Sequence, residues 1–391
     1  MPGWDEAIRD QIDDGSIQVV GIILEQHPDR CQLFMQWKQM GWPILVDSMN
    51  LIGAPLVPLS YLIDESGSVT ALAGRARSLD DFLAIEPVEW FPSDAASAPD
   101  LDELASAAIS TDARSLGQLG AQLLLWGGSS RLNQAIEVLE RAVELAPDQG
   151  DPHFRLGVAY RRRYESDLRE PGDFAAAVSQ WGAALDTDPN QYIWRRRIQQ
   201  YGPRLDKPYP FYDWVDEARE TIRARGDEPV DLRVEPRGAE IAQPARELAS
   251  SGNPENPDPD ARIFRDEEGF ISVETVVVPH TYGDGRAVRV HLMFRPNSSL
   301  KAHWNNEGGG LVVWVDAPEG WAVGQRLSKV DNLEAATSIE VRQVELDLKI
   351  PDDVPAGVVT IPAYALYYVC EDAGGVCLYR RQDLEIRVEL E

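Results

Sequence analysis

Cysteine, histidine and lysine are all scarce in this chain of 391 residues, which has three cysteines, five histidines and five lysines. Cys370 and Cys377 lie close together, whereas Cys31 is far from both in the sequence. A structural zinc site needs four ligands at tighter spacing than these residues offer. The sequence therefore argues against a zinc site, and we expect neither a metal nor a cofactor.

Long apolar runs and an excess of positive charge are also missing. No run reaches the roughly 18 apolar residues that a membrane helix requires, so we expect no membrane insertion from this sequence. The formal net charge is −28 at pH 7. A surface this acidic disfavours nucleic acid and anionic lipid as partners.

The most informative feature that is present is the cysteine pair near the C-terminus. Cys370 ends an apolar, β-prone run, Cys377 precedes a second strand-like stretch, and an acidic turn with two glycines joins them. Two cysteines so placed can meet across a hairpin, where a disulfide forms with little backbone movement. Spacing alone leaves two interpretations open: a structural staple worth about 2–3 kcal/mol on the chain-entropy model, or a redox centre.

The residues around the pair carry a resemblance to a known family. The stretch 369–379 reads VCEDAGGVCLY, and residues 300–304 (LKAHW) and 316–321 (DAPEGW) precede it. These stretches resemble the N-terminal periplasmic domain of the DsbD family of transmembrane thiol:disulfide interchange proteins, over about residues 270–390. The resemblance implies an immunoglobulin-like β-sandwich in which Cys370 and Cys377 are a redox pair. The cysteines here enclose six residues, one more than the family pattern.

His303 is the one histidine that the sequence singles out, because it adjoins Trp304 and two asparagines. One interpretation is that His303 tunes a nearby thiolate. The alternative is a hydrogen-bonded residue at the rim of the domain. Alternating apolar runs separated by turn residues predict the strands of this domain: residues 271–278, 288–294, 311–315, 339–350, 358–361, 363–369 and 384–390.

The N-terminal part alternates between strand and helix patterns. A buried strand is expected at residues 17–24. Further strands are expected at 44–47, 61–64 and 69–73, and helices at 28–41 and 79–85. Residues 42–47 (WPILVD) and 57–69 (VPLSYLIDESGSV) resemble the redoxin families, including the periplasmic TlpA-type reductases. In that family the proline matching Pro58 is cis and packs against the active-site disulfide, and we expect the same isomer and role here. The prediction is a thioredoxin-like domain without its first strand.

The resemblance also places a catalytic CxxC just before Met1-Pro2, where this sequence has none. We expect that the native protein is longer and carries a signal peptide, the first strand and the CxxC. It would then be periplasmic or otherwise extracytoplasmic. The start as given is neither basic nor followed by an apolar core, which predicts a cytoplasmic protein if the chain is complete. Alternatively, the redoxin domain has lost its chemistry and serves as a binding platform; Cys31 is interpreted as a bystander.

The middle of the chain repeats a helical pattern. Ala135, Leu139, Ala142 and Pro147 recur 42 positions later as Ala177, Trp181, Ala184 and Pro189. Together with two preceding Leu-Gly pairs, this resembles the tetratricopeptide repeat. The arginine runs 161–163 and 195–197 have two interpretations. They form either a basic groove for an acidic peptide, or ion pairs with Asp186, Asp188 or Glu165 on a solvated face.

The predicted fold class is multidomain: a truncated thioredoxin-like α/β domain, an all-α repeat and an all-β sandwich. The expected function is an extracytoplasmic thiol–disulfide exchange protein with a thiol or disulfide protein as partner and a peptide or protein client on the helices. The alternative is a non-catalytic interaction scaffold whose disulfide is structural. The expected boundaries, in order, are a redoxin domain, a linker, the repeats, a linker and the sandwich: 1–86, 87–112, 113–225, 226–262 and 263–391.

Overall fold

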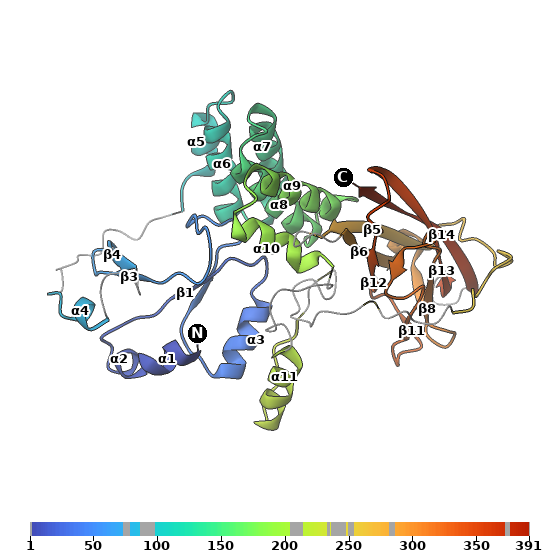
Figure 1. Cartoon of the computed structure of the whole chain (residues 1–391), viewed down its shortest axis with the longest axis horizontal. Coiled ribbons are helices and arrows are strands. Elements are labelled where there is room, and N and C mark those ends of the chain that lie inside the picture. Colours follow the sequence, from blue (N-terminus) through green and yellow to red (C-terminus); the bar gives the residue numbers. More distant parts are fainter. Residues whose placement is uncertain are drawn as a thin grey trace. The chain divides into compact units, whose positions relative to one another are not determined.

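The computed structural model describes residues 2–72, 79–86, 98–203, 214–232, 235, 248, 254–280, 286–371 and 376–390. The chain divides into an N-terminal unit, residues 1–197 with 218–231, and a C-terminal unit, residues 198–217 with 232–391. Figure 1 shows helices in the first and antiparallel strands in the second. The protein is therefore a mixed helix-and-sheet chain. None of the helices in the described part combines the length and apolar character that a membrane span needs.

The first part of the N-terminal unit contains short elements around two small sheets. Strand β1 pairs in parallel with β2, and β3 pairs antiparallel with β4. The Val57–Pro58 peptide bond before β3 is cis, the isomer that the sequence favours. The elements are α1 (Pro2–Ala7), α2 (Arg9–Asp13), β1 (Gly21–Ile23), α3 (Asp29–Lys38), β2 (Ile44–Val46), β3 (Tyr61–Ile63), β4 (Val69–Leu72) and α4 (Leu79–Leu83).

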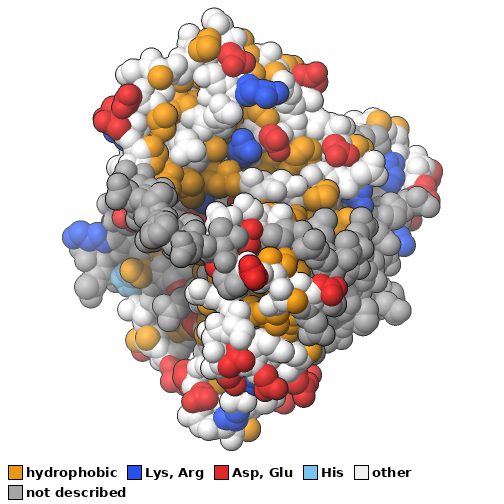
Figure 2. Space-filling view, turned by 90° about the vertical axis from the view of Figure 1, so that its left-hand side faces the viewer, with side chains coloured by type: hydrophobic (Ala, Val, Ile, Leu, Met, Phe, Trp, Pro, Cys, Tyr) orange, Lys and Arg blue, Asp and Glu red, His pale blue; other side chains and the backbone are white. Residues whose placement is uncertain are grey.

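The strand expected at residues 17–24 is shorter and less buried than its apolar sequence predicts. It comprises only Gly21–Ile23, and Ile22 is 45% exposed. Leu45 on β2 is 57% exposed and Ile63 on β3 is 54% exposed. The reason is that each small sheet has two strands within the described residues, so its apolar faces are left partly uncovered. Figure 2 shows hydrophobic side chains at the surface on one face of the molecule.

The helical part of the N-terminal unit contains two helix pairs that pack alike. A Cβ on Gly120 of α6 would overlap the side chain of Leu139 on α7. A Cβ on Gly157 of α8 would overlap the indole of Trp181 on α9 in the same way. Repeated small residues in the sequence thus mark repeated close helix contacts. The helices are α5 (Leu101–Ala107), α6 (Ala113–Trp126), α7 (Leu132–Leu145), α8 (Gly150–Tyr164), α9 (Asp173–Thr187) and α10 (Tyr192–Tyr201), with α11 (Trp214–Ala224) further along the chain.

This close packing predicts opposite effects for two glycine substitutions. We expect Gly157→Ala to lower the free energy of unfolding by about 1–3 kcal/mol, because the new methyl group forces the fully buried Trp181 to move. Gly182→Ala, within α9, meets no atom within 4 Å. It should raise stability by up to about 1 kcal/mol, because alanine is the better helix former. Urea unfolding of both variants tests this, and equal effects would contradict it.

The second arginine run contributes a buried anchor. Arg197 is 1% exposed, and its guanidinium donates to Gln26 Oε1 at 2.6 Å. It also donates to the carbonyl oxygens of Leu24 at 2.9 Å and Ser48 at 3.0 Å. These two carbonyls lie in the segments that follow β1 and β2. Arg197 therefore fixes the strand-bearing part of the N-terminal unit to its helices.

The first arginine run is likewise engaged within the unit. Arg161 pairs with Glu165 at 2.8 Å, one of the partners expected from the sequence. Arg163 pairs with Asp173 at 2.7 Å, and Arg162 donates to Ser48 Oγ at 3.0 Å. Burial lowers the pKa of Arg162 below its ordinary value, and the neighbouring positive charge of Arg197 adds to this. These contacts favour a packing role for the run over a peptide groove.

The C-terminal unit is built from two antiparallel sheets. One has four strands in the order β5-β6-β12-β9, and the other has the order β10-β8-β13-β7-β11 with β14 paired to β13. Their inward-facing side chains form one large apolar core, including Phe294, Trp304 and Tyr367. The strands are β5 (Ile271–Pro279), β6 (Ala287–Pro296), β7 (Ala302–Asn305), β8 (Leu311–Val315), β9 (Ala322–Val323), β10 (Leu327–Val330), β11 (Thr337–Ser338), β12 (Arg342–Lys349), β13 (Gly357–Glu371) and β14 (Cys377–Leu390).

Strand β13 is continuous where the sequence predicts two strands with a break at Pro362. The carbonyl of Pro362 accepts a hydrogen bond from the amide of Asp316, which follows β8. The backbone of Pro362 therefore faces the β8 side, so its missing N–H removes no hydrogen bond to β14. The pairing with β8 ends at Ala363 and Val315, so the missing N–H lies beyond the paired part of β8, where a proline is tolerated. Strand β7 (Ala302–Asn305) is an addition that the expected strands did not include.

Candidate functional site

A disulfide between Cys370 and Cys377 joins the end of β13 to the start of β14. The two strands pair antiparallel along their length, and the cysteines lie directly opposite each other with a Cα–Cα distance of 4.1 Å. The expected meeting of the two cysteines across a hairpin is thus confirmed. The acidic turn between them, residues 372–375, lies outside the described residues.

The two sulfur-bearing residues differ in exposure. Cys370 is only 3% exposed, whereas Cys377 is exposed. The cause is their position in the sheet: β13 has β14 on one side and β7 on the other at this point, but β14 pairs only with β13 among the described strands. A thiolate from another molecule therefore has easier access to Cys377 than to Cys370.

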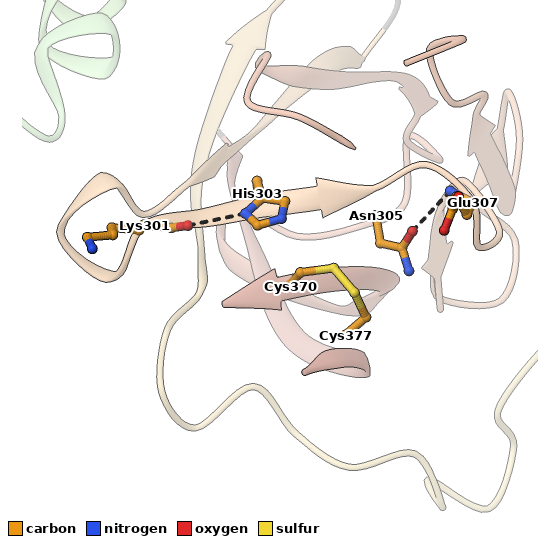
Figure 3. Close-up of a disulfide and its surroundings, with 6 residues drawn as sticks. All are labelled: Lys301, His303, Asn305, Glu307, Cys370 and Cys377. Carbon is orange, nitrogen blue, oxygen red and sulfur yellow. Dashed lines mark hydrogen bonds between the residues drawn. A yellow bond between two sulfur atoms is a disulfide. The ribbon is translucent and has the colours of Figure 1, made fainter. Parts of the chain in front are cut away.

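His303 lies beside the buried end of the disulfide. In the pairing of β13 with β7, Cys370 is directly opposite His303 (Figure 3). Directly opposite residues in an antiparallel pair project from the same face, so the imidazole and the disulfide share one surface. The Nδ1 atom of His303 lies 3.3 Å from the carbonyl oxygen of Lys301. If Nδ1 carries a proton and donates to this carbonyl, Nε2 is left to interact with a neighbouring group.

Two stacked tyrosines adjoin the disulfide on the same face. Tyr368 and Tyr379 are opposite each other one pair further along β13 and β14 on this face, with ring centroids 4.4 Å apart. The backbone at Gly308 lies on the ring of Tyr368, where a Cβ would come within 2.6 Å of the ring atom Cγ. Burial raises the pKa of the Tyr379 hydroxyl, and the neighbouring Tyr368 raises it further. The two stacked rings form an aromatic surface beside Cys377.

Residues 306–310, which join β7 to β8 and include three glycines, form a glycine loop that covers Tyr368. A polar network holds this loop in place. Asn332 Nδ2 donates to the carbonyls of Asn306 at 2.9 Å and Gly308 at 2.8 Å. Arg342 donates to Asn332 Oδ1 at 3.0 Å, and its guanidinium lies 4.3 Å from the ring centroid of Trp304. Because Trp304 belongs to the apolar core, this network ties the loop to the interior.

On the core-facing side of β13, the residues near Cys370 are also held by ring contacts and a hydrogen bond. The ring of Tyr367 meets that of Trp304 edge to face at 5.8 Å. The Tyr367 hydroxyl donates to Asp266 Oδ2 at 2.7 Å. Burial raises the pKa of this hydroxyl strongly, and the hydrogen bond to Asp266 raises it further. Tyr367 is therefore a neutral structural residue that positions the strand end carrying Cys370.

The remaining residues singled out from the sequence belong to the N-terminal unit. Pro58 lies in the segment before β3, and its proposed role beside a redox centre stays a prediction. Cys31 lies in the first turn of α3. Burial raises the pKa of its thiol to about 11, and the neighbouring Glu25 adds to this. Since the thiolate is the reactive form, Cys31 has the character of the bystander that the sequence suggested.

Sequence reasoning missed several parts of the disulfide site. The Tyr368–Tyr379 stack, the glycine loop and the Asn332–Arg342 network depend on strand register, and only the clustering of tyrosines and glycines hinted at them. In the described residues, no three His, Cys, Asp or Glu side chains gather in a way that could hold a metal ion. Comparison with family models and with curated proteins found no match for the chain.

Proposed function

We propose that the protein is an extracytoplasmic thiol–disulfide exchange protein whose redox centre is the Cys370–Cys377 pair. The observation that carries this proposal is the unequal exposure of the two cysteines, with Cys377 accessible and Cys370 3% exposed. The resemblance of residues 270–390 to the N-terminal domain of the DsbD family supports it. In the same proposal, the C-terminal unit is an immunoglobulin-like sandwich, the helix pairs are tetratricopeptide repeats, and residues 1–86 are a thioredoxin-like domain.

The proposed exchange proceeds in two steps. A partner thiolate attacks Cys377 Sγ; the new sulfur–sulfur bond forms as the Cys370–Cys377 bond breaks, and Cys370 leaves as a thiolate. A second partner thiolate then attacks the partner's own sulfur in this mixed disulfide, which releases Cys377. The partner ends oxidised and the cysteine pair reduced. In the reverse direction, Cys377 attacks a partner disulfide and Cys370 resolves the intermediate.

In this proposal His303 acts on the leaving group, which is the Cys370 thiolate. His303 lies directly opposite Cys370, so a hydrogen bond from its imidazole N–H would stabilise the thiolate that forms there. A lower pKa of the leaving thiol speeds exchange. The helix pairs recruit or hold a protein client, as repeats of this kind do.

The reduction potential of the Cys370–Cys377 pair tests the function directly. We expect a value between about −120 and −270 mV, the range of exchange-active pairs. The measurement is a titration with glutathione redox buffers, followed by alkylation and mass spectrometry. A pair that stays oxidised below about −300 mV is a structural staple. The scaffold function, with a disulfide that only braces the hairpin, would then replace redox exchange.

A further inference from the structure

Among the described residues, no strand pairs with the outer edge of β14 beside Cys377. On this edge the amide of Arg381 donates to the carbonyl of Phe264 at 2.8 Å, and the amide of Asp266 donates to the carbonyl of Arg381 at 2.9 Å. These bonds form a single parallel bridge between Arg265 and Arg381. Within the described residues, no other strand or bridge pairs with this edge. The backbone pairing on this edge is thus limited to Arg381 and does not reach Cys377 in the described part of the chain.

The backbone of Cys377 points toward this open edge. Alternate residues of a strand direct their N–H and C=O groups to the same side. Because Arg381 bonds away from β13, Tyr379 and Cys377 also direct these groups away from β13. The Cα–Cα distance of 4.1 Å between Cys370 and Cys377 agrees, since directly opposite residues that exchange no backbone hydrogen bonds lie about 4.5 Å apart.

The in-line geometry of thiol–disulfide exchange also places the attacking thiolate at this edge. A thiolate displaces a sulfur in line, approaching the attacked atom from the side opposite the leaving sulfur. The disulfide runs from β13 to β14, so a line from Cys370 through Cys377 continues over the open edge. The opposite line, through Cys370, continues over β7 and His303. The nucleophile therefore reaches Cys377 through the space that an added strand would occupy.

Exposed apolar side chains lie along this edge on both faces of the strand. Phe264 is 79% exposed, Val376 is 70% exposed and Tyr379 is 37% exposed. Phe264 lies where the existing edge pairing ends, and Val376 and Tyr379 lie on either side of Cys377–Leu378. Large apolar side chains left in water at one strand edge indicate a surface that is covered by a partner.

We propose that the redox partner adds to β14 as an extended strand along residues 376–379, with its cysteine opposite Cys377. This inference rests on the proposed exchange function and names its recognition mode. The partner segment continues the edge pairing that begins at Arg381, and its backbone pairs with the groups of Cys377 and Tyr379. Its apolar side chains cover Val376, Tyr379 and Phe264. Main-chain hydrogen bonds of this kind give affinity without a fixed side-chain sequence.

A cysteine peptide with selective backbone methylation tests the proposal. The probe is a five-residue peptide with central cysteine flanked by valine and threonine on each side. One derivative is N-methylated at residues 1, 3 and 5, and another at residues 2 and 4. In an added strand, one set of amides faces β14 and the other faces solvent. We expect one derivative to form the mixed disulfide about tenfold more slowly than the other, since it loses its pairing bonds.

N-acetylcysteine amide separates recognition from chemistry, because it carries the thiol without a strand. Rates are measured on the oxidised full chain by intact-mass spectrometry. If both methylated peptides react at the same rate while the small thiol also reacts, strand addition is wrong and exchange stands. If no thiol reacts, the proposed function itself fails.

A matched pair of protein variants gives a second readout. Tyr379→Pro removes an amide that faces the open edge and leaves the bonds to β13 intact, a position where proline is tolerated. Tyr379→Val removes the same ring but keeps the amide. We expect the rate ratio of the unmethylated peptide to N-acetylcysteine amide to be about tenfold lower in the proline variant. Equal ratios would overturn strand addition, and the peptide comparison stands even if the proline variant does not fold.

Discussion

Replacing Cys370 by serine is expected to trap a long-lived mixed disulfide on Cys377. In this variant the exposed Cys377 thiol attacks a disulfide probe, and no resolving thiol remains to release the product. In the Cys377→Ser variant the remaining Cys370 is 3% exposed. We expect its reaction with an aromatic disulfide such as Ellman's reagent to be about 100-fold slower, because access to the sulfur limits exchange. Stopped-flow absorbance gives both rates, and intact mass identifies the adduct.

The thiol of Cys31 contributes a background reaction to both rates, since Cys31 is present in both variants. Burial raises the pKa of its thiol to about 11, so its contribution at pH 7 is slow and equal in the two proteins. A third variant, Cys31→Ser in each background, measures that contribution. Similar rates for Cys370 and Cys377 would contradict the assignment of Cys377 as the attacking and attacked residue.

Replacing Arg197 by alanine is expected to cause a large loss of stability in the N-terminal unit. The guanidinium donates to Gln26 and to the carbonyls of Leu24 and Ser48. Removing it leaves these acceptors buried without their donor, at about 1–3 kcal/mol for each unsatisfied group. We expect a loss of about 3 kcal/mol or more in the free energy of unfolding, measured by urea denaturation with tryptophan fluorescence.

Arg195→Ala is the matched control, two residues away on the same helix. The guanidinium of Arg195 contacts the carbonyl of Pro189 at an exposed position. Its removal should change stability by less than about 0.5 kcal/mol. Hydrogen exchange adds a local readout, since residues 24–27 and 48–54 should lose protection in the Arg197 variant alone. A loss of similar size in both variants would show that Arg197 is not the anchor.

Local sequence patterns predicted the elements where periodicity was strong. Leu139, Trp181 and the glycines that face them indicated two helix pairs, and helices α6 to α9 pack with those contacts. The alternating run before Cys370 predicted a strand, and the cysteine spacing predicted a hairpin with a disulfide across it. These features depend on neighbours within one or two elements, which is why the sequence displays them.

Features that depend on residues far apart in the chain could not be predicted from the local sequence. The apolar run at residues 17–24 predicted burial, but Ile22 is 45% exposed because its strand has a single described partner. The arginine runs allowed a peptide groove, and Arg197 instead binds carbonyls about 150 or more positions away in the sequence. Pro362 suggested a break in β13, but the pairing with β14 runs through Pro362 without interruption.

The sequence by itself predicted that Cys370 and Cys377 meet, because two strand-forming runs are joined by a short segment with two glycines and the cysteines are seven positions apart. Only the tertiary structure decided which of them is reachable. Strand β7 covers the Cys370 side and the edge of β14 leaves Cys377 open, and both depend on strand order in the sheet. Strand order is set by packing between segments far apart in the chain, so local residue patterns do not contain it.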